Sequence, residues 1–541
     1  MLTSIRHWLD RNILELGREM RLSFLPPLMV YVAAGVSGLT GIVGTFFVKE
    51  HLGLSAAFLA ALGFWAGIPW ALKMPIGHLV DLIWRRKAAL VWLGAALIAA
   101  SLLIMYGLVA EPLRMGRVMS LEAWFVVSAL LSPVGYVIQD VVADAMTVEA
   151  VPRVDEHGQA LPAETRRLMN TTLQTLGRVA IIGGGVLVSM VNVLMFHGVE
   201  ALPQAAKVAV YAQVYGMALL IPLVSVAGVL LAALLRRREE RRLRAHGFAE
   251  AQLRELLEPP LLPLKPNWWI LGGSALFVAF SLSVGLAQLE FGQEIIFVGS
   301  FAIISFLMAR LLRELDEESR RTLLGTAIII FVFRAIPGPG AGSTWWMIDV
   351  LGFDQSFLAR LSLLASVLTL LGLFLFRRFM GERSIARIVA FLTLAGTLLS
   401  LPTLGMYYGL HEWTAAHTGG IVDARFIALI DTALESPLGQ IAMVPMLAWI
   451  ANSAPAGLKA TYFAVMASFT NLALSAAQLG TKYLNQLYHV SREVRDPASN
   501  AVKVAADYGQ LGSLFLTAIA LGLVLPFAAI WLTRLCRLRS A

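Results

Sequence analysis

The chain has 541 residues, of which 58% are hydrophobic and only 14% are charged. Ordinary soluble domains have roughly 45–50% apolar and about 25% charged residues, so this composition excludes a soluble globular protein. The formal charge of +8 comes from short basic clusters between apolar runs, a pattern typical of the cytoplasmic loops of membrane proteins and not of nucleic-acid binding. The single cysteine, Cys536, excludes a disulfide framework and a cysteine-based metal site.

The first segment, residues 1–26, is amphipathic. Trp8 and Leu9, for example, stand between Arg6 and Arg11, so the segment lacks the continuous apolar core of a cleavable signal peptide. We predict that it lies on the cytoplasmic surface of a membrane.

Apolar runs long enough to cross a bilayer fill most of the remaining chain. A helix rises about 1.5 Å per residue, so about 20 residues cover the hydrocarbon core. We predict about 14 such spans, at 27–48, 55–80, 88–109, 121–149, 169–195, 209–235, 268–287, 292–312, 322–346, 356–376, 385–405, 424–450, 457–487 and 508–534.

The spans divide the chain into two bundles and an insertion. The predicted parts are an N-terminal six-helix bundle at 27–235, a cytoplasmic linker at 236–267, an inserted transmembrane hairpin at 268–312, a C-terminal six-helix bundle at 322–534 and a basic cytoplasmic tail at 535–541. Basic clusters such as 85–87 and 236–244 place both termini in the cytoplasm and predict an integral protein of a bacterial inner (plasma) membrane. Trp345 and Trp346 fall at a predicted span end, where aromatic residues often mark the membrane interface.

A short internal repeat indicates that the two bundles are related. The segment from Leu52 to Ala60 recurs from Leu351 to Ala359, and the same offset matches Gly41 with Gly340. The second bundle therefore begins near residue 322, and the hairpin is an insertion of two helices that preserves the orientation of everything after it. Two parallel six-helix repeats around a midplane site resemble the major facilitator superfamily.

Acidic residues inside the spans are functional candidates, because an ionisable residue costs roughly 2.5–3.5 kcal/mol to insert. Asp140 and Asp144 are four residues apart in the fourth span and share a helical face, and the span ends at Glu149. Asp431 and Glu435 repeat this spacing in the equivalent span of the second bundle. Paired carboxylates in a poorly solvated site repel each other, which favours proton uptake. We predict these five acids as proton-coupling candidates and expect the two pairs to face one cavity.

Basic residues inside the spans are candidates for binding a solute. Arg178 lies in the fifth span, Arg334 in the first span of the second bundle, and Lys73 toward the inner end of the second span. A structural alternative is an ion pair, for example of Arg178 with Asp140 or Asp144. One such pair could serve both purposes by breaking and re-forming during a transport cycle.

A run of proline and glycine follows Arg334. Pro337 and Pro339 remove backbone donors, and Gly338 and Gly340 loosen the helix. A span tolerates such a break only where the backbone faces protein or a water-filled cavity. We predict an exterior gate at these four residues; the alternative is a packing kink.

The loop after the second span contains Gly77, Asp81, Arg85 and Arg86. It resembles the major facilitator signature between helices two and three, in which a glycine lets helices approach, an aspartate receives a helix end or a cation, and basic residues hold the cytoplasmic side. The resemblance implies a gating role for these four residues. Leu82 stands where the signature usually has a basic residue.

Four stretches together resemble the folate-biopterin transporter family, namely 67–81, 140–149, 455–471 and 507–509. The resemblance implies a proton-linked carrier for folates or pterins, with Lys73, Asp140, Asp144 and Asn471 as the matching polar positions. Asn471 therefore joins the substrate-binding candidates. The departures from the family pattern are Met74, Lys459 and the inserted hairpin.

The expected function is secondary active transport by alternating access, coupled to protons, of a small organic anion similar to folate or pterin. We found no catalytic motif, nucleotide loop or metal-ligand spacing, so we expect neither an enzyme nor a cofactor. The expected partners are the solute, protons and the lipid bilayer, with no nucleic acid, and a monomer suffices for this architecture. The stretch 139–145 also resembles permeases for peptidoglycan fragments, which is the first alternative. The second alternative is a non-transporting pigment-binding or assembly factor on the same fold.

Overall fold

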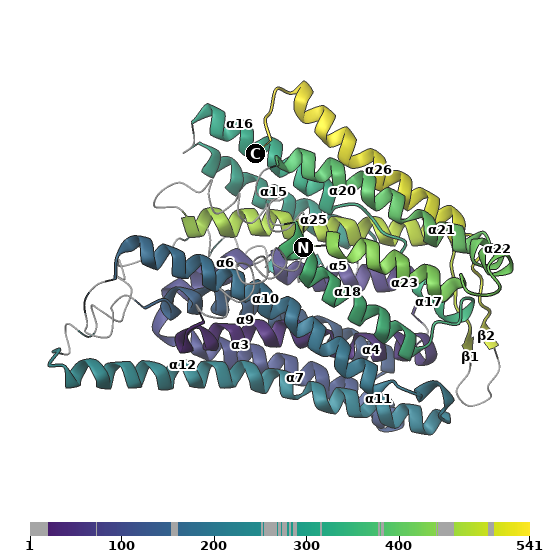
Figure 1. The fold of residues 1–541 in the computed structure, drawn as a ribbon, viewed down its shortest axis with the longest axis horizontal. Coiled ribbons are helices and arrows are strands. Elements are labelled where there is room, and N and C mark those ends of the chain that lie inside the picture. The colour runs from purple at the N-terminus through teal and green to yellow at the C-terminus, as the bar shows by residue number, and fades with distance from the viewer. Residues whose placement is uncertain are drawn as a thin grey trace, which may run out of the picture.

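The computed structural model describes residues 20–540 except for 53, 72, 153–158, 160, most of 250–288, 314–315, 377–378, 380–382, 440, 442–458 and 496–501. Regular structure in the described part is almost entirely helical (Figure 1). Eight helices of this part are long and apolar enough to cross a membrane. The prediction of an all-α polytopic membrane protein is confirmed. The first helix of the predicted hairpin, 268–287, lies largely outside the described residues, as do residues 1–19 of the predicted surface segment.

The N-terminal half comprises the helices up to α12. Their bounds are η2 Leu22–Phe24, α3 Leu25–Val36, η3 Ser37–Thr40, α4 Gly41–His51, α5 Ala56–Ala71, α6 Lys73–Leu82, η4 Trp84–Arg86, α7 Ala88–Ala110, α8 Pro112–Gly116, α9 Leu121–Ala150, α10 Ala163–Met195, η5 Val199–Ala201, α11 Gln204–Ala218 and α12 Leu220–Ala245. Helix α12 continues ten residues beyond the predicted span end, into the predicted linker. The pairs Arg236–Glu240 and Arg242–Glu239 lie on this extension, where such neighbouring charges support an exposed helix.

The C-terminal half follows helix α15, Gly292–Leu312, which is the second helix of the predicted insertion. Its elements are α16 Glu317–Arg334, α17 Ala341–Asp349, α18 Gln355–Leu375, α20 Ile385–Leu399, α21 Leu401–Tyr407, α22 Leu410–His417, α23 Ala424–Glu435, η6 Ser436–Leu438, α25 Lys459–Leu487, β1 Val494–Arg495, β2 Val502–Val504 and α26 Leu511–Leu535. The short antiparallel pair β1–β2 and the helix α22 are additions that the hydropathy pattern did not predict.

Two local features of the halves match at the offset of the sequence repeat. The first span of each half is interrupted, by the 3-10 turn Ser37–Thr40 in one and by residues 335–340 in the other. The second span of each half, α5 in one and α18 in the other, then begins with a side-chain cap. The Ser55 hydroxyl accepts a hydrogen bond from the Phe58 amide at 3.0 Å, and the Asp354 carboxylate accepts one from the Phe357 amide at 2.7 Å. Side chains of this kind satisfy the free amides at a helix start, which explains why both helices begin at the same place in the repeat.

The halves pack together mainly through two pairs of helices. Helix α5 packs against α25, and α10 packs against α18. Since α5 matches α18 in the repeat, the contacts are those expected from two similar units related by a two-fold axis. Ser189 of α10 lies 2.9 Å from Ser362 of α18, hydroxyl to hydroxyl.

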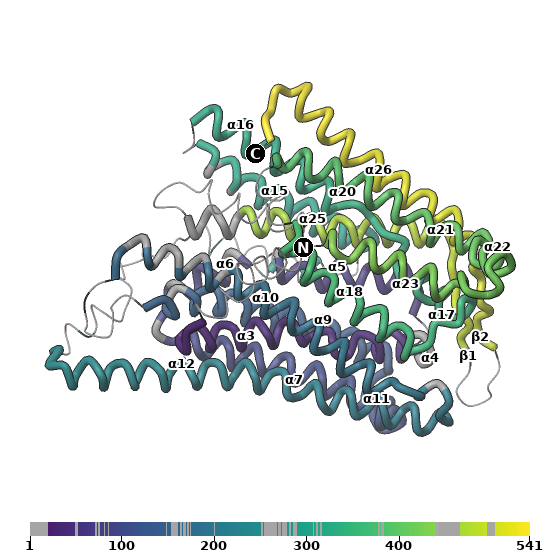
Figure 2. Tube along the Cα trace, viewed as in Figure 1, coloured from purple at the N-terminus to yellow at the C-terminus, as the bar shows by residue number. Residues whose placement is uncertain are grey.

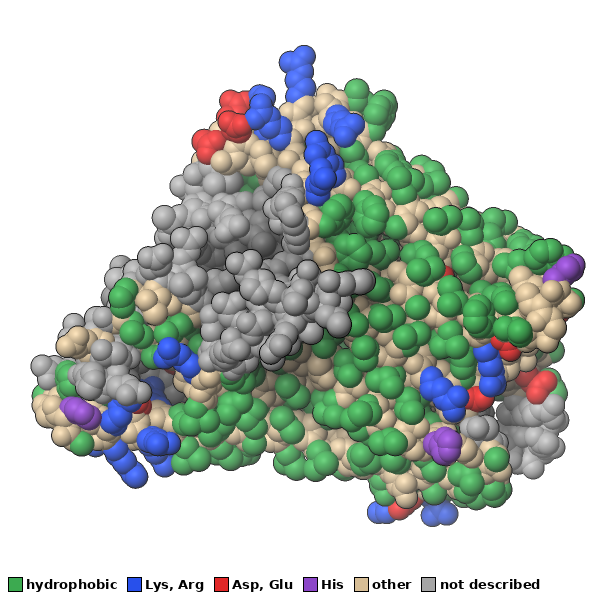
Figure 3. All heavy atoms as spheres, in the orientation of Figure 1, with side chains coloured by type: hydrophobic (Ala, Val, Ile, Leu, Met, Phe, Trp, Pro, Cys, Tyr) green, Lys and Arg blue, Asp and Glu red, His purple; other side chains and the backbone are tan. Residues whose placement is uncertain are grey.

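The two halves meet at one end of the molecule and diverge at the other. In Figure 1 the helices converge at the end that carries β1, β2 and α22, which we call the hairpin face. They spread apart toward the C-terminal end of α12 and the start of α16, a divergence that the Cα trace also shows (Figure 2). Figure 3 shows Lys and Arg side chains gathered over the ends of α12, α16 and α26, and we call this end the basic face.

The prediction that Trp345 and Trp346 lie at the membrane interface is wrong. Their side chains are only 2% and 3% exposed. Trp346 packs with Phe515 and Tyr407 in the core of the C-terminal half. Hydropathy places both residues at the end of a span, but the break at 335–340 lets α17 turn its aromatic face inward.

Candidate functional site

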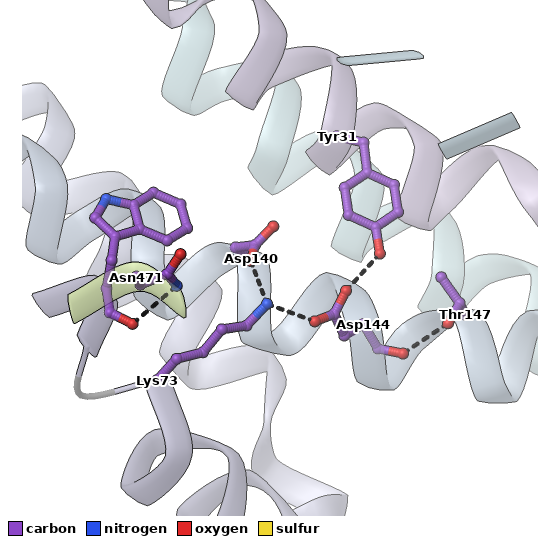
Figure 4. Close-up of polar contacts among 7 residues, drawn as sticks. Tyr31, Lys73, Asp140, Asp144, Thr147 and Asn471 are labelled. Atoms are coloured by element: carbon purple, nitrogen blue, oxygen red, sulfur yellow. Dashed lines mark hydrogen bonds and ion pairs between the residues drawn. The ribbon is translucent and has the colours of Figure 1, made fainter. Parts of the chain in front are cut away.

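A largely buried lysine joins two acids (Figure 4). The ammonium of Lys73 lies 2.6 Å from Asp140 Oδ2 and 2.8 Å from Asp144 Oδ2. The Lys73 and Asp140 side chains are 17% and 18% exposed, whereas Asp144 is 44% exposed. Tyr31 completes the site by donating a hydrogen bond of 2.7 Å from its hydroxyl to Asp144 Oδ1. We call these four residues the lysine–diacid site.

Three helices position the lysine–diacid site. Asp140 and Asp144 lie one helical turn apart on α9, so their carboxylates point the same way. Lys73 is the first residue of α6, next to the interruption between α5 and α6, and Tyr31 comes from α3. A single ammonium can donate to both carboxylates at once, because it carries three N–H donors. The two acids are thereby neutralised in part, which reduces the cost of burying them.

The C-terminal half reaches the same region through Asn471. Its side-chain amide on α25 donates a hydrogen bond of 3.2 Å to the carbonyl of Trp70, three residues before Lys73 (Figure 4). The residue therefore links the end of α5 to the opposite half. A movement of α25 relative to α5 would act directly on the backbone that holds Lys73.

Arg178 does not form the ion pair that the sequence suggested. Gly177, the residue before it, lies against the Tyr31 ring, but within the described residues no ion pair or hydrogen bond of the Arg178 side chain is present. Lys73 takes the place next to the acids because α6 runs beside α9. Arg178 is thus a partly buried cation close to the lysine–diacid site and not part of it.

The acids of the second half are arranged differently from those of the first. The Asp431 carboxylate is 3.4 Å from the Thr403 hydroxyl of α21, and its other oxygen is buried without a hydrogen-bond partner in the described part of the chain. Glu435 is exposed. Asp431 thus faces a neighbouring helix of its own half, which contradicts the expectation that both acidic pairs face one cavity from equivalent positions. The repeat predicted matching spans, but no lysine occupies the equivalent of Lys73, where Gly372 stands instead.

The predicted helix break after Arg334 is present. Helix α16 ends at Arg334 and α17 begins at Ala341. The Gly338 amide donates to the Thr481 hydroxyl at 3.0 Å and the Asn485 amide donates to the Pro339 carbonyl at 3.2 Å, so α25 replaces hydrogen bonds that the break removes. The Nε of Arg334 is buried and has no hydrogen-bond partner among the described residues.

The residues predicted to gate the basic face are only partly visible. Gly77 lies on α6, but a Cβ added there would meet no described atom within 4 Å, so close helix approach does not explain this glycine. The side chains of Asp81 and Arg85 lie outside the described residues, and Arg86 is exposed. Glu149 instead pairs with Lys87 at 2.6 Å, which ties the end of α9 to the start of α7. Glu149 is thus held by a structural ion pair about one turn beyond Asp144 and the lysine–diacid site.

Sequence reasoning missed Tyr31. The residue stands in an apolar span and belongs to no polar pattern, so only the packing of α3 against α9 brings its hydroxyl to Asp144. Among the described residues there is no group of three His, Cys, Asp or Glu side chains that could hold a metal ion. The lysine–diacid site consists of two carboxyl groups, one ammonium and one phenol hydroxyl in direct contact.

Two packed halves of membrane-spanning helices, with the lysine–diacid site in the first of them, give the major facilitator fold. The sequence pattern of the BT1 family matches residues 34–539. The chain belongs to the BT1 family, and the resemblance to folate-biopterin transporters inferred from the sequence is confirmed. The members of this family are transporters, so the protein is not an enzyme.

Two named relatives are similar in sequence. The folate-biopterin transporter of Synechocystis sp. is 24% identical over 475 residues, which cover 87% of this chain and 76% of the relative. The putative folate transporter 2 of Plasmodium berghei is 26% identical over 167 residues, covering 30% of this chain and 34% of the relative.

Solved structures of transporters share the fold at low sequence identity. A POT family transporter in complex with 5-aminolevulinic acid superposes with a TM-score of 0.60 at 14% identity, covering 96% of each chain. A mutant form of the nucleoside transporter NupG gives a TM-score of 0.51 at 12% identity over 94% of this chain and 99% of its own. A D-xylose-proton symporter gives 0.50 at 13% identity, over 94% of this chain and 95% of its own.

Proposed function

We propose that the protein carries a folate-like or pterin-like organic anion across the membrane by alternating access, coupled to protons. The observation that carries this proposal is the bridge of Lys73 between Asp140 and Asp144. Coupling of a proton to a solute requires a site with two arrangements of charge, and a lysine between two acids can supply them by changing which acid it pairs with.

Asp144 is the proposed site of proton binding. It is the more exposed of the two acids, and the Tyr31 hydroxyl can keep donating to one of its oxygens while the other is protonated. Protonation would remove the charge that attracts Lys73 and leave its ammonium paired with Asp140 alone. The ammonium would then be free to turn one of its donors toward an anionic group of the solute.

Arg178 and Arg334 are the proposed additional contacts for the solute. Both are buried or partly buried cations that no described acid neutralises, one in each half. A folate carries carboxylates, which a guanidinium can bind through two parallel hydrogen bonds. Asn471 is proposed to contribute by linking the position of α25 to the backbone next to Lys73.

We further propose that the basic face is cytoplasmic and that the structure represents a state closed at the hairpin face. The excess of Lys and Arg at the basic face supports this orientation. At the hairpin face the two halves are joined by hydrogen bonds such as that of Gln355 to Tyr211, as in a carrier that is closed on that side. Alternating access would close the basic face and open the hairpin face. We also propose that the two bundles comprise residues 27–235 and 322–534 and the inserted hairpin residues 268–312, as the sequence predicts.

Uptake into proteoliposomes tests the proposal. The purified protein is reconstituted, a pH gradient is imposed, and uptake of labelled folate or a pterin is measured. We expect Asp144→Asn to abolish gradient-driven uptake and to retain exchange of solute for solute, because the site then stays in the protonated arrangement. Glu122→Gln, at the exposed start of the same helix, is the matched control. Gradient-driven uptake that survives in Asp144→Asn would contradict the proposed role.

Thermal stabilisation by ligands distinguishes the alternatives. The purified protein is heated with folates, pterins or anhydro-muropeptides. Stabilisation by folates or pterins supports the proposal, whereas stabilisation by anhydro-muropeptides alone would favour a peptidoglycan-fragment permease. A pigment that purifies with the protein, together with no response to any solute, would favour the non-transporting alternative.

A further inference from the structure

A buried arginine connects the two halves at the hairpin face. Arg492 lies in the segment between α25 and β1, in the C-terminal half, and is only 2% exposed. One terminal nitrogen of its guanidinium donates to the Leu54 carbonyl at 2.9 Å, and the other donates to the Val48 carbonyl at 2.8 Å. Both acceptors belong to the N-terminal half, at the corner between α4 and α5.

The surroundings of Arg492 suit a cation. Val48 lies in the last turn of α4, where the backbone carbonyls carry partial negative charge, and its carbonyl also accepts a hydrogen bond of 3.3 Å from the Leu52 amide. On the other side, the guanidinium stacks over the ring of Trp345, 4.7 Å from its centre. Burial lowers the pKa of Arg492 to about 10, so the side chain remains charged at neutral pH.

The segment that carries Arg492 is held firmly in its own half. The Tyr508 hydroxyl donates to Asp349 Oδ2 at 2.6 Å, and the Tyr407 hydroxyl donates to the Tyr508 carbonyl at 2.9 Å. An isolated bridge joins Ser491 to Asp507. The backbone of Arg492 is therefore fixed in the C-terminal half, and only its side chain crosses the boundary between the halves.

We infer that Arg492 is a latch that holds the hairpin face closed, and that its release is required for that face to open. The inference rests on the proposed alternating access. The fork of the guanidinium fits two carbonyls of one helix corner, and both partners can be hydrated again when the halves separate. These two contacts are made to backbone carbonyls, which no charge pattern in the sequence reveals.

The latch has support from the neighbouring contact between the halves. Gln355, at the start of α18, donates a hydrogen bond of 2.7 Å to the Tyr211 hydroxyl of α11. Both residues are buried, at 5% and 0% exposure, and Tyr211 belongs to the same hydrophobic cluster as Val48, a partner of Arg492. Opening this face must break the Gln355–Tyr211 hydrogen bond and the contacts of Arg492. Of these, only the Arg492 contacts involve a charged group, and hydrogen bonds of charged groups are the stronger ones.

Spin-label distances across the hairpin face test the latch. Cys536 is the single cysteine and is exposed, so Cys536→Ser provides a cysteine-free background. Labels at Val118→Cys and Ile421→Cys, which are 78% and 71% exposed, report the separation of the halves. We expect Arg492→Ala to raise the population with the longer distance by at least about tenfold, because the loss of one charged hydrogen bond gives about that factor and the variant removes two. Arg492→Lys, which keeps the charge without the fork, should give a smaller increase.

The matched control is Arg114→Ala, which removes an exposed arginine of α8 whose ion pair in the described part of the chain is with Glu111, three residues away. Equal distance distributions in Arg492→Ala and Arg114→Ala would overturn the latch. If Arg492→Ala does not fold, the distance distribution of Arg492→Lys is compared with that of Arg114→Ala instead. The proposed function is tested separately by the wild-type distances with and without a pH gradient. A single unchanging wild-type distance would contradict alternating access. A wild-type distance that shifts with the gradient, together with equal distributions in the wild type and Arg492→Ala, would contradict the latch alone.

Discussion

Replacement of Lys73 by alanine tests the energetic role of the lysine–diacid site. The change removes two charged contacts, of 2.6 Å to Asp140 and 2.8 Å to Asp144. Two carboxylates would then face each other one helical turn apart without a cation between them. Removing one partner of a buried ion pair costs about 3–5 kcal/mol, because the remaining charge is left uncompensated. The 44% exposure of Asp144 lets water replace part of the lost contact, so we expect a loss near the lower end, about 3 kcal/mol.

The loss should depend on pH with a defined sign. Without the ammonium, the two carboxylates of the Lys73→Ala variant repel each other when both are charged, and the folded protein can relieve the repulsion by binding a proton. The folded variant then binds more protons than the unfolded chain, so its stability falls as the pH rises. The gap between variant and wild type should therefore be larger at pH 8 than at pH 5.

Thermal unfolding in detergent, followed by tryptophan fluorescence at the two pH values, measures this effect. The double variant Lys73→Ala/Asp140→Asn should recover most of the lost stability, because it removes the more buried of the two uncompensated charges. Lys207→Ala is the matched control, since Lys207 makes no ion pair with the described residues. An equal loss in Lys73→Ala and Lys207→Ala, or a double variant no more stable than Lys73→Ala, would refute the reasoning.

Two further substitutions probe the contacts around the site. Gly340 has φ 76° and ψ −166°, a conformation essentially restricted to glycine, and an added Cβ would lie 2.7 Å from the Asn485 amide nitrogen. Gly340→Ala should therefore lower the stability by about 1–3 kcal/mol in thermal unfolding. Gly338→Ala is the control and should not lower it, because an added Cβ there meets nothing within 4 Å. An equal loss of stability in the two variants would contradict the backbone argument. Glu294→Gln should loosen α15 from α25, because Glu294 pairs with Lys482 at 2.9 Å, and hydrogen exchange of α15 should rise. Unchanged exchange of α15 would show that its apolar contacts hold it alone.

The sequence by itself determined the class of protein and its symmetry. Length and hydropathy required membrane-spanning helices, because apolar runs of this size cannot be covered in water. The repeat from Leu52 to Ala60 marked equivalent corners, and the structure has helix caps at the matching residues Ser55 and Asp354. The proline and glycine run after Arg334 likewise predicted the break correctly, since a missing backbone donor acts locally.

Only the tertiary structure decided which charges meet. The spacing of Asp140 and Asp144 put both on one face of a helix, but their partner depended on how α6 and α3 pack against α9. Because of this packing, the cation that pairs with them is Lys73 and not Arg178. The same spacing in Asp431 and Glu435 led to no ion pair among the described residues, because the packing of α23 turns Asp431 toward Thr403. The contact of Arg492 with two backbone carbonyls of the other half also left no trace in the sequence, because every residue has a carbonyl and only the fold selects which one is in reach.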